Sequence, residues 1–425
     1  MNIIKTIFKD KELRKRLLYT LFMLLVFRLG AAITLPYINT GSLGSVFDSA
    51  SIFSVMNMLG GGTLEKFSLF ALGISPYITA SIVIELLSMG VVPSFTRWKK
   101  EGNNGKKKQQ TATAILSVII AVIQGAAMVY GMDTGYGIVS NGTPLRYAYI
   151  TLLMTAGSLA TMWIGQRITE KGIGNGTSLI IVTGIVGAFP GGFMSAYSSM
   201  NARSFIFFVL AYLLIMLMVV FVEMSVRKID IFYASGIHSS KADDEVNLPF
   251  KINSASVIPV IFAISLMTAP RTIMTFMKKT AFIKKLSSIL DYTQPVGFAI
   301  YIIMIILFTF FYAGLQMNVK EIAKNLSQTG GVVPGVRAGK DTKKYLGKVL
   351  NRITVAGAIL LALVAVIPIV IPHIWSVAAG TSLQLGGTGL IIVANVAMEF
   401  IRQIETYSVK ERYSLYDETG GMHNG

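Results

Sequence analysis

Ten runs of mostly apolar residues recur along the 425-residue sequence, each close to the length that a helix needs to cross a lipid bilayer. About 20 residues of α-helix span the hydrocarbon core, and helices satisfy their own backbone hydrogen bonds there. The sequence therefore predicts an all-α integral membrane protein with ten transmembrane helices. The runs are Leu17–Leu35, Phe67–Leu87, Thr113–Met132, Ala148–Ile164, Leu179–Met194, Phe205–Val222, Ala255–Ala269, Val296–Leu315, Ile353–Ile371 and Gly387–Ile401.

The composition agrees with a membrane protein and excludes a soluble domain. Only 14% of residues are charged, 53% are hydrophobic, and the mean hydropathy is +0.62. A soluble domain has about 25% charged residues. The absence of cysteine excludes disulfides and thiolate metal sites. The basic segment 1–16 precedes a run of full spanning length that has no small-residue cleavage site, so no removable signal peptide is expected.

The basic residues predict the orientation. With the N-terminus inside, 29 of the 38 lysines and arginines fall in cytosolic segments, and eight fall in outer loops. Cytosolic loops are enriched in Lys and Arg, so both termini are predicted on the cytosolic side of a cytoplasmic membrane. The outer loop 271–294 departs from this pattern because it carries five basic residues. Membrane orientation alone explains why these loops are rich in Lys and Arg. The alternative explanation is that the loops dock a partner.

Ten spans divide into two five-span halves, residues 1–200 and 201–425, and five is odd, so the second half is inverted relative to the first. Glycine and proline interrupt matching spans of inverted repeats near the working site. Pro76, Pro190 and Pro259 lie in the second, fifth and seventh spans, and a glycine-rich stretch, 386–389, opens the tenth. These four spans are predicted to line a central path.

The predicted path contains few ionisable groups. The spans hold Arg28, Glu85 and Glu399, and all three histidines lie in loops or tails. Small-solute and ion transporters place charges near the midplane. A passive protein-conducting channel is therefore favoured over a secondary transporter, which remains the alternative. An intramembrane enzyme is excluded for lack of paired catalytic residues, and no metal site or cofactor is expected.

Six motifs resemble the SecY family, the protein-conducting channels of bacteria, in order and spacing over nearly the whole chain. They are Gly73-Ile-Ser-Pro-Tyr-Ile-Thr-Ala-Ser-Ile82, Glu170-Lys-Gly-Ile-Gly-Asn-Gly-Thr-Ser178, Asn247-Leu-Pro-Phe-Lys-Ile-Asn253 with Val257-Ile-Pro259, Gly330-Gly-Val-Val-Pro-Gly-Val-Arg337, Val349-Leu-Asn-Arg-Ile-Thr354 and Gly386-Gly-Thr-Gly-Leu-Ile-Ile392. One such string is weak evidence, but six in order are strong.

The resemblance implies a clamshell of two five-helix halves around a central pore, hinged between the fifth and sixth spans. Unfolded secretory polypeptides would cross through the centre, and transmembrane segments would leave sideways between the second and seventh spans. A ring of apolar side chains would close the pore. Carried over by motif, the ring is Ile78, Ile82, Ile181, Ile185, Ile261 and Ile392. Residues four apart share one helix face, and an apolar constriction seals by dewetting. The alternative for each isoleucine is ordinary packing.

The resemblance also implies a plug and a lateral gate. The plug, a short segment that blocks the outer funnel, would be Gly60, Gly61, Gly62, Thr63, Leu64, Glu65, Lys66, Phe67 and Ser68. Composition alone predicts only a loop there. Gln124 and Asn253 are candidate polar contacts across the gate, although buried amides are often structural. Glu85 stands where the family commonly has Gln, and it adds a titratable group beside the gate.

Two cytosolic loops, 225–252 and 316–352, are candidates for partner docking. The resemblance implies that Arg337 and its loop, with Lys340, Lys343 and Lys344, engage the motor ATPase SecA and the ribosome. A basic tip suits the phosphates of ribosomal RNA. The small subunits SecE and SecG, nascent chains, signal peptides and membrane lipids are further implied partners. A partner motor, or the ribosome, and the proton-motive force would supply the energy.

Two features depart from the family, and a third misleads. The loop 235–245 is short and carries three consecutive acids where the family is usually basic, which weakens a docking role for that loop. Ala338 replaces a common Pro. The glycines of 172–176 resemble part of a nucleotide-binding loop, but no strand precedes them and no Walker lysine follows, so a nucleotide site is excluded.

Overall fold

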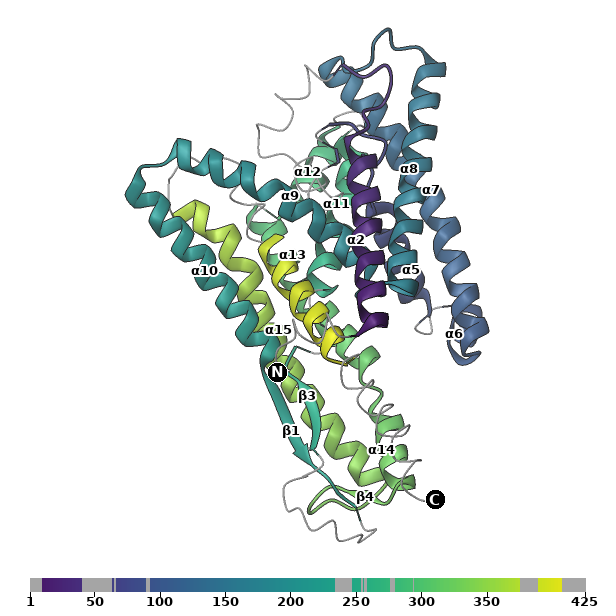
Figure 1. Ribbon diagram of the computed structural model, residues 1–425, viewed down its shortest axis with the longest axis vertical. Helices are drawn as coiled ribbons and strands as arrows, with labels where there is room; N and C mark the ends of the chain where they lie inside the picture. The colour runs from purple at the N-terminus through teal and green to yellow at the C-terminus, as the bar shows by residue number, and fades with distance from the viewer. Residues whose placement is uncertain are drawn as a thin grey trace.

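The computed structural model describes residues 10–39, 63–64, 66–88, 92–233, 247–253, 255, 258–275, 280–292, 294–374 and 389–406. Most of these residues form helices that run side by side (Figure 1). The labelled helices are α2 (Lys11–Ala32), α5 (Ser75–Leu86), α6 (Pro93–Lys100), α7 (Asn103–Tyr136), α8 (Pro144–Lys171), α9 (Gly176–Ser199), α10 (Ala202–Met224), α11 (Ile258–Thr275), α12 (Ala281–Ile289), α13 (Pro295–Gln316), α14 (Val319–Gln328) and α15 (Lys340–Ile374). A further helix, 389–406, is called the C-terminal helix here.

Several helices pass the length and hydropathy requirements for a membrane span. Among the described residues, five long apolar helices and three shorter ones are present. This confirms a multi-pass helical membrane protein. The long spans are Asn103–Thr134, Pro144–Lys171, Ala202–Met224, Pro295–Gln328 and Lys340–Ile367, and the shorter helices are Ser75–Leu86, Gly176–Gly191 and Ile258–Met274. Helices α7 and α15, at 34 and 35 residues, exceed the roughly 20 that a bilayer requires. Their charged first turns therefore extend beyond the membrane.

Two of the three prolines that marked interrupted spans begin helices instead of breaking them. Pro76 and Pro259 each occupy the second residue of a helix, α5 and α11. Proline is favoured at that position because the amide it lacks has no partner within the helix. Pro190 does lie inside α9, and Pro270, inside α11, was not singled out by the sequence. The second span is nevertheless interrupted, because turns occupy residues 66–74 before α5 begins.

The described parts of the loops 225–252 and 316–352 form a small packed unit that the sequence did not predict. Strand β1 (Val226–Asp230) pairs antiparallel with β3 (Asn247–Lys251), and β2 (Phe232–Tyr233) pairs antiparallel with β4 (Gly331–Val332). We call these strands, α14 and the first turns of α15 the strand module; it lies at the bottom of Figure 1. Its core consists of Ile229, Ile231, Phe250, Leu326, Val333, Leu346, Leu350 and Ile353.

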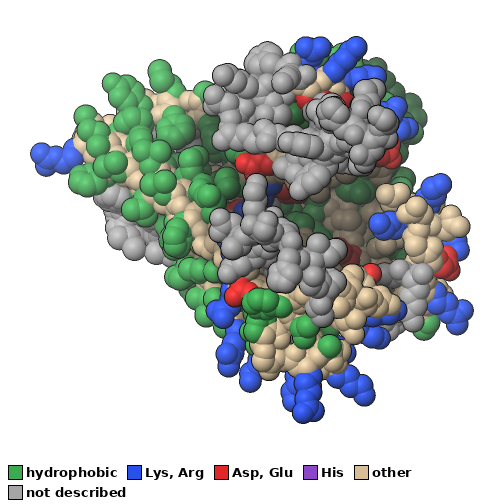
Figure 2. All heavy atoms as spheres, turned by 60° about the horizontal axis from the view of Figure 1, so that its bottom comes forward, with side chains coloured by type: hydrophobic (Ala, Val, Ile, Leu, Met, Phe, Trp, Pro, Cys, Tyr) green, Lys and Arg blue, Asp and Glu red, His purple; other side chains and the backbone are tan. Residues whose placement is uncertain are grey.

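The two ends and the sides of the molecule differ in charge. Exposed lysines and arginines surround the end that carries the strand module and α6, and we call this the basic end (Figure 2). The side formed by α10 is covered with hydrophobic side chains, and Leu214, Leu217 and Phe221 are each more than 60% exposed. Such a surface is stable only against lipid or another protein. The α10 side of the bundle is therefore expected to contact lipid or another protein.

Candidate functional site: an apolar centre between two groups of helices

The six isoleucines of the predicted ring lie in one buried cluster. They come from α5, α9, α11 and the C-terminal helix, which are separated widely in sequence, and none is more than 5% exposed. Ile78 and Ile82 lie one helical turn apart on α5. The structure thus brings together all six candidates. The cluster also contains Phe27 and Tyr301, so shared burial alone does not separate a pore from ordinary packing, and the ring stays a prediction.

The cluster contains residues from helices that precede residue 200 and from helices that follow it. We call these the first and the second group of helices, and they meet at the cluster. Helix α11 packs against both α5 and α7, and it also packs against α13. Elsewhere, α2 packs against α8 and α9, and α13 packs against α15. Among the contacts between elements before and after residue 200 are those of α11 with α5 and α7, and that of α10 with α9.

Part of the predicted plug forms a tight buried turn. Gly60, Gly61, Gly62 and Glu65 lie outside the described residues. Thr63, Leu64, Phe67 and Ser68 are each 0% exposed, whereas Lys66 is exposed. The Thr63 hydroxyl donates to the Phe70 carbonyl over 2.6 Å, and the Ser68 hydroxyl donates to the Thr63 carbonyl over 3.0 Å. These polar contacts allow an irregular backbone to be buried.

The described plug residues pack away from the isoleucine cluster. Leu64 and Phe67 belong to a second cluster that contains Met128 of α7 and Met154 of α8. The glycine at 157 on α8 permits this approach, because a Cβ there would lie 1.8 Å from the Leu69 carbonyl oxygen. The blocking role of this segment stays a prediction.

A side-chain hydrogen bond joins the two groups of helices at Glu85. The hydroxyl of Tyr312, on α13, donates to Oε2 of Glu85, on α5, over 2.9 Å. Sequence reasoning placed Glu85 beside a gate but did not find Tyr312. An aromatic residue with a polar tip, near the end of an otherwise apolar span, was the available signal.

Gln124 is buried on a helix that also packs against α11. It lies on α7 with 2% exposure, and its Oε1 accepts no hydrogen bond in the described part of the chain. Ser265, on α11, is fully buried, and its Oγ likewise makes no hydrogen bond to any described residue. Helices α7 and α11 pack together. Buried unsatisfied groups are costly and mark places where partners change. Sequence analysis missed Ser265, a small polar residue within an apolar run.

Asn253 makes its side-chain contact within the second group of helices. Its Nδ2 donates to Oε2 of Glu223, on α10, over 3.2 Å. Arg402, on the C-terminal helix, donates from Nη1 to Oε1 of the same carboxylate over 2.9 Å and from Nη2 to the Glu223 carbonyl. Glu223 is 3% exposed. Its burial is possible because two side chains supply donors to the carboxylate. The sequence did not identify Glu223, since the loop that brings Asn253 to it was not predicted to fold.

Lys251 carries the charge nearest to this group on the strand module. Desolvation lowers the pKa of Lys251, and the positive charge of Arg402 lowers it further, whereas Glu223 and Glu399 raise it. Desolvation is the largest of these causes. The adjoining ends of α10, β3 and the C-terminal helix therefore meet in one charged cluster.

The basic tip, which is the turn that carries Arg337, is exposed and has a well-defined backbone conformation. Arg337, Lys340, Lys343 and Lys344 are all exposed, at the turn into α15. Gly335 and Gly339 adopt positive φ angles of 74° and 93°, which L-residues with side chains rarely adopt. Thr342 donates its hydroxyl to the Arg337 carbonyl over 2.8 Å, which fixes the turn. Four cations are thus held on one projecting surface.

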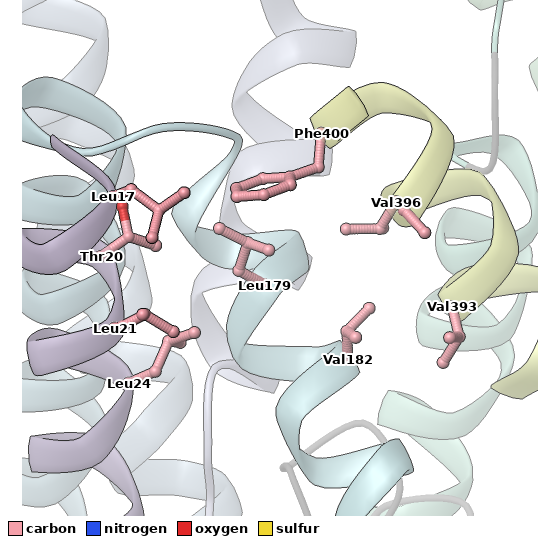
Figure 3. A pocket seen from close by; sticks show the side chains of 10 residues that line it. Leu17, Thr20, Leu21, Leu24, Leu179, Val182, Val393, Val396 and Phe400 are labelled. Atoms are coloured by element: carbon pink, nitrogen blue, oxygen red, sulfur yellow. The ribbon is translucent and has the colours of Figure 1, made fainter. Parts of the chain in front are cut away.

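A pocket of about 230 Å³ lies beside the centre, between α2, α9 and the C-terminal helix (Figure 3). Aliphatic side chains from the three helices point into it, and Phe400 closes one end. Thr20 supplies the one hydroxyl of its lining. The pocket suits an apolar group, and a polar solute would find few hydrogen-bond partners there. The lining consists of Leu17, Thr20, Leu21, Leu24, Leu179, Val182, Val393, Val396, Ala397 and Phe400.

Comparisons with known proteins agree with this arrangement. The sequence model of the SecY family matches residues 68–401. The chain is 40% identical over 425 residues to protein translocase subunit SecY of Bacillus subtilis, covering 96% of this chain and 98% of that protein. The corresponding protein of Bacillus licheniformis is 39% identical over 424 residues, with the same coverage. The chain belongs to the SecY family.

Solved structures extend the SecY likeness to the fold. A structure described as a protein conducting channel has a TM-score of 0.67 and 18% identity, covering 97% of this chain and 95% of that chain. Sec61 in the canine ribosome–channel complex from the endoplasmic reticulum has a TM-score of 0.65 at the same identity and coverage. At 18% identity these matches show a common fold. The resemblance found in six short motifs is therefore confirmed over nearly the whole chain.

Proposed function

We propose that this chain forms the central channel subunit of a Sec protein translocase. It conducts unfolded secretory polypeptides across the bacterial cytoplasmic membrane and releases transmembrane segments sideways into the lipid. The observation that carries the proposal is the meeting of six isoleucines from four helices in one buried cluster between two groups of helices. An apolar constriction excludes hydrated ions and can deform around a passing chain of any sequence.

The path opens by separation of the two halves, 1–200 and 201–425, along the α5–α11 and α7–α11 contacts. The buried, unpaired oxygens of Gln124 and Ser265 support this side as the lateral gate, because a gate exchanges partners when it opens. The hydrogen bond between Tyr312 and Glu85 lies on the same side and is formed in the resting state. Residues 60–68 act as the plug on the outer side.

Partners dock at the basic end. Exposed Arg337, Lys340, Lys343 and Lys344 attract anionic surfaces, which suits SecA and the phosphates of ribosomal RNA. SecE and SecG complete the membrane complex against exposed apolar faces such as that of α10. The protein itself is a passive channel, and a motor or the ribosome, together with the proton-motive force, drives the polypeptide. Both termini lie on the cytosolic side, in line with the distribution of basic residues.

The test is crosslinking from the centre of the cluster. A photoreactive residue replaces Ile82, and a secretory precursor is arrested in proteoliposomes supplied with the motor. The proposal predicts a precursor adduct that requires a functional signal sequence. The matched control is the same photoreactive residue at Ile303, which is 61% exposed on α13 and should crosslink lipid. Adducts at other positions but not at 82 would reject the ring, and no adduct at any position would favour a small-solute transporter.

A further inference from the structure

The C-terminal helix holds both groups of helices at its basic end through two adjacent residues. Oε1 of Gln403 accepts a hydrogen bond from the backbone amide of Gly174, in the turn between α8 and α9, over 2.7 Å. The neighbouring Arg402 donates to the carboxylate and the carbonyl of Glu223, at the end of α10. One helix end is therefore bound to residues on both sides of position 200.

The turn at 172–176 is shaped to receive this helix. Gly174 has a φ of +88°, and a Cβ there would lie 3.2 Å from the Phe400 ring. A Cβ at Gly172 would lie 2.4 Å from the hydroxyl of Thr20, on α2, and that hydroxyl accepts the Ile173 amide over 2.9 Å. The glycines thus allow a close approach of three segments. This accounts for the glycine motif that sequence analysis excluded as a nucleotide site.

A small hydrophobic cluster seals the same junction. Leu13 of α2, Ile173 of the turn and Ile404 of the C-terminal helix are each at most 4% exposed and pack together. Buried apolar contact combined with satisfied hydrogen bonds gives a joint that resists separation. The described residues of the junction thus combine buried apolar contact with two backbone amides, of Ile173 and Gly174, that are paired with side-chain oxygens.

The junction lies on the side of the molecule where the two halves are covalently connected. The chain passes from α9 to α10 at residues 200–201, at the end opposite to the basic end (Figure 1). Helix α9 begins at Gly176, directly after the turn, and α10 ends at Met224, directly after Glu223. The covalent connection and the junction thus stand at the two ends of the α9–α10 pair.

We propose that Arg402 and Gln403 form a non-covalent pivot, and that the halves rotate about a line from this pivot to the connection at 200–201. The pivot stays closed while the channel opens on the side of Glu85 and Tyr312. Both residues are positioning residues, because they act on the path through the helix that carries Ile392. This inference rests on the proposed function and on the hinge between the fifth and sixth spans, and adds to them the residues that hold the halves together at the other end of that hinge.

Distances between paired spin labels test the pivot directly. The sequence has no cysteine, so two introduced cysteines give a single labelled pair. Lys171→Cys with Glu405→Cys spans the pivot, and Ser94→Cys with Gln316→Cys spans the gate side; all four residues are exposed. Each pair is measured by double electron–electron resonance in the resting channel and with a precursor arrested in it.

The pivot predicts that arrest lengthens the 94–316 distance and leaves the 171–405 distance unchanged. Lengthening of the 171–405 distance overturns the proposal, and so does the absence of change at both pairs. Failure of the proposed function is distinguishable, because it appears as the absence of a precursor adduct at every position tested, whereas loss of the adduct at position 82 alone rejects only the ring.

Two substitutions at one position separate a pivot from a general structural contact. Gln403→Leu removes the acceptor for the Gly174 amide, whereas Gln403→Glu keeps an oxygen there. We expect Gln403→Leu to broaden the 171–405 distance distribution in the arrested state and to lower the maximal translocation rate several-fold at unchanged precursor affinity. Gln403→Glu should restore a narrow distribution. Equal behaviour of the two variants, both folded by thermal unfolding, overturns the role of Gln403.

Discussion

The hydroxyl of Tyr312 donates to the carboxylate of Glu85 and thereby joins α13 to α5 over 2.9 Å. The two residues are 227 positions apart in sequence. This contact lies between the halves that must separate in the proposed function, so its strength bears on the closed state of the channel.

Tyr312→Phe removes the donor and keeps the ring. A hydrogen bond contributes about 0.5–1.5 kcal/mol, so we expect a weaker closed state. The measurement is translocation of a precursor with a defective signal sequence, which should rise in the variant. Tyr301→Phe is the control, because the Tyr301 hydroxyl makes no hydrogen bond to any residue that the structure describes. Equal behaviour of the two variants would contradict the gate role of this contact.

Polar substitution of the isoleucine cluster should open an ion leak. Ile82→Thr with Ile392→Thr places hydroxyls in the constriction, which favours wetting. We expect higher resting conductance in planar bilayers and relaxed signal-sequence selectivity. The control pair is Ile303→Thr with Ile359→Thr, at isoleucines 61% and 53% exposed on α13 and α15. Unchanged leak and unchanged selectivity in the central double variant would reject the ring.

Gly157→Ala should destabilise the packing of α8 against the turn at residue 69. The added methyl would lie 1.8 Å from the Leu69 carbonyl oxygen, and a backbone atom cannot move aside cheaply. Overpacking of this kind costs about 1–3 kcal/mol, so the thermal unfolding temperature in detergent should fall. Gly191→Ala, on α9 with no atom within 4 Å of the added methyl, should be neutral or slightly stabilising. A fall of equal size at both positions would contradict this account.

Charge reversal at the basic tip should weaken partner docking. Arg337→Glu turns an exposed cation into an anion at the turn into α15. Co-sedimentation with ribosomes should fall, and the loss should grow smaller as salt rises, because the attraction is electrostatic. Lys284→Glu, on α12 and also exposed, is the control with the same change of charge. Equal loss in both variants would show an effect of net charge alone.

Lys251 should make stability depend on pH. Its pKa is lowered in the folded protein, chiefly by desolvation, so the unfolded chain binds more protons between the lowered value and 10.5. Stability therefore rises with pH across that window. Lys251→Met removes this pH-dependent contribution. The unfolding temperature of the variant minus that of the wild type should therefore be largest below the lowered pKa of Lys251 and decline toward pH 10.5. A difference that does not vary with pH would contradict the shift.

The sequence predicted the membrane class because its signal is local, whereas the six central isoleucines came from the family resemblance and their role as a ring stays a prediction. Apolar runs and paired isoleucines at Ile78 and Ile82 appear within one or two turns of a helix. Helix ends were less predictable: α15 begins 13 residues before the predicted run at Ile353, because its first turns are polar and pack on the strand module. Pro76 was read as a break because its position in the helix depends on where the preceding turns end.

Contacts between segments that are distant along the chain could not be predicted from the sequence. Nothing near Asn253 predicts that its amide meets Glu223, because the intervening strands β1 and β3 first bring the chain back onto α10. The same holds for Gln403 and Gly174, which are 229 residues apart. The motif around Gly174 was recognised from the sequence, but its purpose became visible only when its neighbours were known.

Helix α15 runs without a break from the exposed lysines at its start into the middle of the bundle. Over about 50 Å, the same helix contributes Leu346 and Leu350 to the core of the strand module, and Leu361 and Ala365 to the cluster that holds the isoleucines. Between Lys340 and Ala365 this helix contains no proline, the residue at which sharp kinks most often form. In the proposed function, a partner that binds at Lys340 would therefore act on the isoleucine cluster through one helix, with no loop between the two sites.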